Sequence, residues 1–167
     1  MKDYFIADTH FGGENIRRYE NRPFDSAAEM DEKLIENWNS IVTAEDMVYI
    51  LGDFSDYASS EKDAEILKQL HGTKVLVMGN HDRHRTPQEW RELGFAECFS
   101  LPVIYKEYFM LSHEPLYINT NMPYANFYGH VHGNPSYKDA CKQSVCVSVE
   151  RIDYTPVEFE KLRAQMV

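Results

Sequence analysis

The chain has 167 residues, which fits one domain over residues 1–167. Hydrophobic residues make up 43% of it, enough to bury a core, and the charged fraction of 26% argues against a disordered protein. Its formal net charge of −10 disfavours broad nucleic-acid binding, because an acidic surface repels the phosphate backbone, and it favours divalent cations. No apolar run approaches the roughly 20 residues that span a bilayer, so we expect no membrane partner. A motif already begins by residue 8, where a signal peptide would need room, so we expect a cytoplasmic protein.

Strand and helix signals alternate in the first part of the chain. Short apolar runs rich in β-branched and aromatic residues predict three strands buried on both faces, at residues 4–7, 47–51 and 74–78. The sequence Ser26-x-x-Glu29 is typical of a capping box and predicts that a helix begins there. The apolar residues of this helix recur at helical spacing and are Met30, Leu34, Trp38 and Ile41.

Two further helices are predicted before residue 95. One begins near Ser59 and ends at Gly72, and its apolar face consists of Ala64, Leu67 and Leu70. The next begins at the cap and proline of Thr86-Pro87-x-Glu89 and ends at Gly94.

Beyond residue 95 the pattern favours strands. They are predicted at residues 102–105, 108–111, 126–128 and 144–149, and Thr155 is expected to cap a last short helix. A βαβαβ half followed by a mainly β half predicts an α/β domain with two packed sheets and helices outside.

Polar residues able to bind metal follow five of the predicted strands. They are Asp8-Thr9-His10, Gly52-Asp53, Gly79-Asn80-His81-Asp82, Ser112-His113 and Gly129-His130-Val131-His132. Ligands collect at the carboxyl ends of strands in open α/β sheets, so we expect these segments to meet at one edge. Residues two apart in an extended segment point the same way, which lets each Asp-x-His or His-x-His pair face a common centre.

The donor types indicate a transition metal. Carboxylate, amide oxygen and imidazole together suit Mn, Fe, Zn or Ni better than Ca or Mg, and the absence of thiolates among them disfavours a closed structural zinc site. Each motif alone has an ordinary explanation, as a capping pair, a polar turn or a core histidine. Five of the seven histidines nevertheless fall in these motifs, so chance is the weaker explanation.

This ordered series of motifs, from residue 8 to 132, resembles the calcineurin-like metallophosphoesterase superfamily, and the size is similar to that of its compact bacterial members. The resemblance implies a four-layer α-β-β-α sandwich of two packed mixed sheets flanked by helices. It implies a first metal held by Asp8, His10 and His132, a bridging Asp53, and a second metal held by Asn80, His113 and His130. It also implies an unligated His81 over the site, with Asp82 beside it as the orienting carboxylate.

The same resemblance implies hydrolysis of phosphate esters by a hydroxide that bridges two divalent ions, with Mn favoured and Fe, Zn or Ni open. His81 would stabilise the transition state or protonate the leaving oxygen, and a structural turn histidine is the alternative. The compact chain favours a phosphodiesterase acting on a small substrate. A phosphomonoesterase, a catalytically silent scaffold of the same fold and a metal-storage or sensor protein are alternatives, but the complete ligand set and His81 favour an enzyme. The native substrate, the physiological metal and the oligomeric state stay open.

Two groups of residues have less certain roles. Arg17, Arg18 and Arg22 follow the first motif and could reach a substrate phosphate, although solvated loop charges are the preferred interpretation. The three cysteines lack CxxC spacing and are expected to be structural thiols in a reducing compartment; they are Cys98, Cys141 and Cys146.

Overall fold

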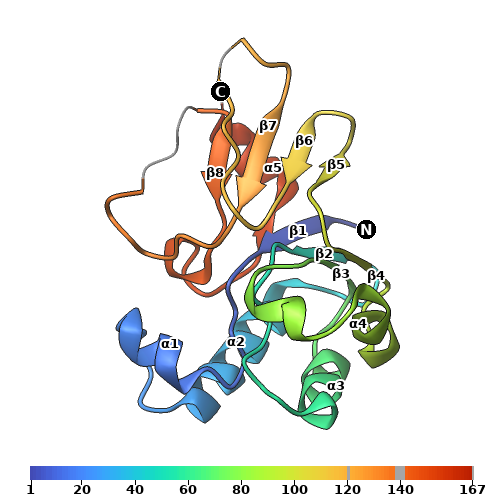
Figure 1. The fold of residues 1–167 in the computed structure, drawn as a ribbon, viewed down its shortest axis with the longest axis vertical. Coiled ribbons are helices and arrows are strands. Elements are labelled where there is room, and N and C mark those ends of the chain that lie inside the picture. The colour runs from blue at the N-terminus through green and yellow to red at the C-terminus, as the bar shows by residue number, and fades with distance from the viewer. Residues whose placement is uncertain (120, 138–141, 167) are drawn as a thin grey trace.

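The computed structural model describes residues 1–119, 121–137 and 142–166. Figure 1 shows two β-sheets with helices packed around them. Both sheets are mixed, which confirms the predicted α/β class of two mixed sheets flanked by helices. Of the helices in the described ranges, none is long and apolar enough to cross a membrane.

The first sheet has the strand order β4-β3-β2-β1-β9. Its strands are β1 (Asp3–Ile6), β2 (Met47–Ile50), β3 (Thr73–Val77), β4 (Glu97–Phe99) and β9 (Val157–Glu158). The first four run parallel and β9 runs antiparallel to β1. The carboxyl ends of β1, β2 and β3 therefore lie side by side at one edge of the sheet.

The second sheet has the order β5-β6-β7-β8. Its strands are β5 (Val103–Tyr105), β6 (Phe109–Leu111), β7 (Ala125–Tyr128) and β8 (Ser144–Cys146). β6, β7 and β8 are parallel, so the carboxyl ends of β6 and β7 are also neighbours. The sheets join where Ala7, just after β1, exchanges backbone hydrogen bonds with Val147 and Val149, just after β8.

Of the five α-helices in the described residues, three agree with the predicted helices. The five are α1 (Glu14–Tyr19), α2 (Ala27–Ile41), α3 (Ser60–Gln69), α4 (Pro87–Leu93) and α5 (Phe159–Ala164), and two 3₁₀ turns follow strands at η1 (His81–His84) and η2 (Val149–Arg151). Ser26 caps α2 by accepting from the Glu29 amide, but the Glu29 carboxylate reaches Asp25 instead of closing a capping box. The box at Thr86 and Glu89 is complete.

Two apolar clusters lie on opposite faces of the first sheet. The cluster on the helix side contains Met30, Leu34 and Trp38, as expected for α2. Ile41 was expected with them, but it is 37% exposed. Ile41 is the last residue of α2. The next residue, Val42, has an extended backbone, and its side chain lies in the core instead of that of Ile41.

The second cluster lies between the two sheets. The ring of Phe5 in β1 packs edge-on against Phe127 in β7, with centroids 5.0 Å apart. Phe159 of α5 packs against Phe109 of β6 at 4.9 Å. Because Tyr4 and Ile6 face the helices while Phe5 faces the second sheet, β1 is buried on both faces as predicted.

The C-terminal segment differs from its prediction. Thr155 does not cap a helix, because its hydroxyl donates to the carbonyl of Asp153. The following residues form β9, which pairs with β1 at the free edge of the first sheet, and α5 begins only at Phe159. The predicted strand 144–149 likewise ends at Cys146 and turns into η2.

Candidate metal centre

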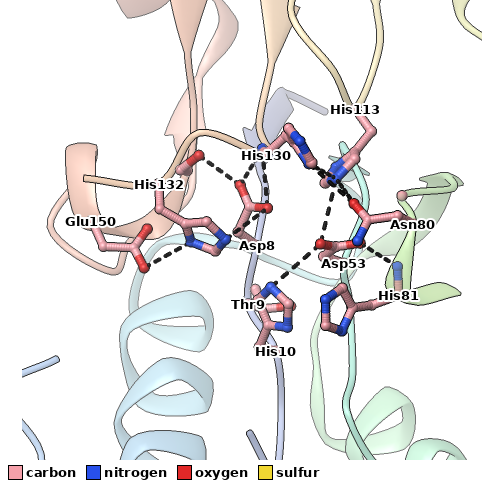
Figure 2. A network of polar contacts seen from close by, with 12 residues as sticks. Asp8, Thr9, His10, Asp53, Asn80, His81, His113, His130, His132 and Glu150 are labelled. Carbon is pink, nitrogen blue, oxygen red and sulfur yellow. Dashed lines mark hydrogen bonds and ion pairs between the residues drawn. The ribbon is translucent and has the colours of Figure 1, made fainter. Parts of the chain in front are cut away.

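The loops after five strands meet at one place between the two sheets (Figure 2). The first sheet contributes Asp8 and His10 after β1, Asp53 after β2 and Asn80 after β3, and the second contributes His113 after β6 and His130 and His132 after β7. Figure 2 shows these side chains pointing toward one another. The structure therefore brings together all seven ligand positions expected from the sequence.

Most of these positions have an unusual backbone conformation. Positive φ angles occur at Asp8 (58°), His10 (47°), Asp53 (54°), His130 (71°) and His132 (49°). Non-glycine residues rarely adopt such angles, and each costs of order 1–3 kcal/mol. Five of the ten non-glycine residues with positive φ in the described chain are thus among the seven positions, which is expected where backbone strain serves a functional site.

Glycines allow the strand ends to approach one another closely. A Cβ atom on Gly79 would lie 2.2 Å from Asp53 Oδ1, and one on Gly129 would lie 2.6 Å from Asp8 Oδ2. Both distances are shorter than any ordinary contact. The glycines that the sequence places beside the motifs are therefore required for the packing of the site.

The first cluster of donors consists of Asp8, His10 and His132, whose ligand atoms lie within 4.8 Å of one another. His10 Nε2 is buried and has no hydrogen-bond partner. A buried polar atom without a partner costs about 1–3 kcal/mol. A divalent cation bound among these three side chains would use this nitrogen, so the donors fit a metal.

The second cluster consists of Asp53, His113 and His130, with Asn80 beside them. Asn80 Oδ1 lies 3.0 Å from His113 Nε2 and 3.1 Å from His130 Nδ1, and the two nitrogens are 3.0 Å apart. Asp53 Oδ2 lies 3.4 Å from His113 Nε2 and 3.5 Å from His10 Nε2 of the first cluster. One carboxylate oxygen thus stands between the two clusters.

Three of the histidines are fixed by contacts of their other ring nitrogen. His10 Nδ1 lies 3.0 Å from Asp56 Oδ1, and His132 Nδ1 lies 3.1 Å from Glu150 Oε1. His113 Nδ1 lies 2.9 Å from the carbonyl oxygen of Leu51. Such contacts set the tautomer and leave Nε2 free for a metal.

Comparison with known proteins identifies the family. Residues 1–162 match the family model described as calcineurin-like phosphoesterase. The chain belongs to this family. Its members are phosphoesterases, a class of hydrolase that generally binds divalent metals, and the two donor clusters agree with this.

Two relatives of this phosphoesterase match along most of their length. It is 39% identical over 166 residues to an uncharacterized protein of Methanocaldococcus jannaschii, a match that covers 95% of this chain and 88% of the relative. The crystal structure of a protein of unknown function from Aquifex aeolicus superposes with a TM-score of 0.77 at 28% identity, covering 98% of each chain.

The contact made by His81 in this phosphoesterase differs from the expected one. His81 Nδ1 lies 3.0 Å from Asp56 Oδ1, the same oxygen that contacts His10. The expected partner, Asp82, is buried, and its carboxylate accepts from the backbone amides of Asp53 (2.7 Å), Phe54 (3.0 Å) and Gly79 (2.8 Å). The carboxylate beside His81 is therefore that of Asp56.

Arg22 is also placed differently from its prediction. It is only 3% exposed, so it is not a solvated loop charge. Its guanidinium donates to the carbonyl oxygens of Asp8 (2.7 Å) and Thr9 (3.0 Å) and pairs with Glu150 at 2.7 Å. Arg22 thus stabilises the loop after β1 through hydrogen bonds to its backbone.

The other two arginines lie on α1. Arg17 binds the carbonyl of Phe24 and the carboxylate of Glu14, and Arg18 is exposed and also pairs with Glu14. Arg17 therefore contacts its own helix and the neighbouring loop, whereas Arg18 contacts its own helix and is solvated as expected.

The electrostatics of the centre suit bound cations. Burial lowers the pKa of the His113 imidazole, but the carboxylates of Asp53 and Asp8 outweigh burial and raise the pKa to about 9. Burial raises the pKa of the Asp53 carboxyl, yet His113 and His10 together hold the pKa well below its usual value. The carboxylates thus attract positive charge to this edge of the sheets.

Proposed function

We propose that this protein hydrolyses phosphate esters at a dinuclear centre. Asp8, His10 and His132 would hold one divalent cation, Asn80, His113 and His130 the other, and Asp53 both. The observation that carries this proposal is the position of Asp53 Oδ2 between two histidine nitrogens, His113 Nε2 and the buried His10 Nε2, which has no hydrogen-bond partner. When bound, the two cations supply a water of lowered pKa and offset the negative charge of the phosphate.

The side chains beside this centre would handle the proton and the alignment. His81 is half exposed, and its Nδ1 is held by Asp56, so its Nε2 is available to the substrate. In its protonated form it would donate a proton to the leaving oxygen, the role of a general acid. Asp82 would be a positioning residue, because its carboxylate fixes the backbone of Asp53 and Gly79.

Mixed nitrogen and oxygen donors favour Mn as the metal, with Fe, Zn or Ni as alternatives. We propose a small phosphodiester as the substrate, because the side chain of His81 is 47% exposed and therefore accessible to a substrate from solvent. A phosphomonoester is the second candidate. A silent scaffold is disfavoured, because the complete donor set and His81 are both in place.

Two wider proposals follow from the same residues. Residues 1–167 would act as one domain, because both sheets contribute donors to the centre. Cys98 and Cys146 are free, buried thiols, and burial raises the pKa of Cys98 to about 12 and of Cys146 to about 11. Unreactive thiols support a role in the cytoplasm. Cys141 lies outside the described residues.

The test combines metal analysis with turnover. Protein loaded with Mn would be assayed on bis(p-nitrophenyl) phosphate and on p-nitrophenyl phosphate, with metal content measured on the same sample. We expect two metals per chain and a higher kcat/KM for the diester. Two bound metals with hydrolysis of neither ester would rule out the enzyme, and a higher kcat/KM for the monoester would reverse the substrate preference.

A further inference from the structure

A cleft of about 690 Å³ opens beside the metal centre. One wall comes from Gly12 and α1, and the other from residues 55–58 after β2. His81 and Asp56 also line the cleft, so it continues directly from the side chain that would protonate the leaving group. A leaving group that His81 protonates would therefore enter this cleft.

Aromatic and aliphatic side chains line the cleft. Tyr19, at the end of α1, is 86% exposed, and Ile16 lies one turn before it on the same wall. The ring of Tyr57 lies so close over Gly12 that a Cβ atom there would be 2.5 Å from it. The hydroxyl of Tyr57 donates to Asp31, which also accepts from the Gly12 amide, so this ring is fixed in place.

The charges in the cleft argue against a second phosphate group. No lysine or arginine is among its lining residues, all of which belong to the described part of the chain. The carboxylates of Glu14 and Asp56 line it instead. A hydrogen bond from Arg17 lowers the pKa of Glu14 to about 2, so this carboxyl stays ionised, and Arg17 and Arg18 both pair with it.

We propose that this cleft binds the leaving alcohol of the substrate, and that this alcohol is neutral and carries a flat ring. The inference rests on the proposed function and narrows its substrate class. Water adds its hydroxyl group to phosphorus and releases its other proton to solvent. The bond from phosphorus to the alcohol oxygen breaks, this oxygen keeps the electron pair and takes the proton of His81, and His81 is protonated again from solvent. The ring then stacks against Tyr19 and Tyr57, whose faces suit it at little entropic cost.

The test uses bis(p-nitrophenyl) phosphate, whose leaving group carries a flat ring. Loss of one ring contact is worth about 0.5–1.5 kcal/mol, so Tyr19→Ser should raise KM about 2- to 12-fold with little change in kcat. Ile16→Asp, which adds a charge to the cleft, should raise KM as well. Tyr137→Ser is the matched control, an exposed tyrosine outside the cleft. Unchanged KM in both cleft variants, at normal metal content, would overturn the proposal.

A second measurement separates this proposal from the proposed function. Saturation-transfer NMR on the Mn-loaded protein would follow adenosine, a neutral ring-bearing alcohol, with glycerol as the ringless control. We expect a signal for adenosine that Tyr19→Ser weakens, and a much weaker one for glycerol. If the wild type hydrolyses neither ester, the proposed function fails, and this binding result alone decides on the cleft. Equal signals for adenosine and glycerol would overturn it.

Discussion

At the scale of single residues, Glu150 contacts one member of the first donor cluster directly and another through an arginine. Its Oε1 contacts Nδ1 of His132, and it also pairs with Arg22, which binds the Asp8 carbonyl. Its Oε2 is buried without a partner. A carboxylate behind a ligand histidine raises the basicity of the imidazole and fixes its orientation, so Glu150 is a positioning residue for metal binding.

Glu150→Gln should therefore weaken binding at one of the two sites. Glutamine keeps the shape and can still accept from Arg22, but it removes the charge behind His132. We expect affinity at the Asp8 site to fall about 10- to 100-fold, while the site around Asn80 keeps its affinity. Calorimetric titration with Mn measures the affinity of each of the two sites. Glu160→Gln, on the exposed face of α5, is the control. Equal weakening of both sites would mean that Glu150 acts only on the fold.

His81 gives the second prediction at this scale. Because it would donate a proton and bind no metal, His81→Ala should lower kcat about 10²- to 10⁴-fold and leave metal content unchanged. His71→Ala is the control, since His71 lies after α3 and contacts the carbonyl of Val42. Full turnover by the His81 variant with metal bound would refute the acid role. Loss of metal would instead assign His81 to the ligands.

At the scale of elements, Asp82 ties the ends of β2 and β3 together through three backbone amides. Asp82→Ala would leave these buried donors without a partner, at about 1–3 kcal/mol each. We expect the free energy of unfolding to fall by about 3 kcal/mol or more, measured by urea denaturation. Glu45→Ala, in the exposed turn before β2, should change little. An Asp82 variant of normal stability but reduced turnover would show that Asp82 acts in the chemistry.

The elements also show how far sequence reasoning reaches. The convergence of the candidate metal donors could be predicted because each follows a strongly apolar strand, and parallel strands end at one edge. Asp56 was missed although it lies only three residues after Asp53, because spacing alone does not reveal a contact to His10 and His81. The pairing of Glu150 with Arg22 could not be predicted, since the two are 128 residues apart and meet only in the folded chain. β9 was missed for the same reason, because two residues pair only where β1 offers a free edge.

At the scale of the whole molecule, the metal centre joins the two sheets. The first sheet supplies Asp8, Asp53 and their neighbours, and the second supplies His113, His130 and His132. Bound metal should therefore stabilise the packing of one sheet on the other. The apolar layer around Phe5 and Phe127 would keep the sheets together without metal, so we expect the metal-free protein to stay folded but to be less stable.

The size of this effect follows from mass action. A ligand at a hundred times its Kd adds about 2.7 kcal/mol to the native state, and 1 kcal/mol shifts Tm by about 2–4 °C in a protein of this size. Each filled site should thus raise Tm by about 5–11 °C. Scanning calorimetry of chelator-treated protein, with and without Mn, measures the shift. Mg is the control, because it prefers an all-oxygen shell and should raise Tm less. An equal Tm with Mn and with chelator would mean that the donors do not bind metal as a bridge between the sheets.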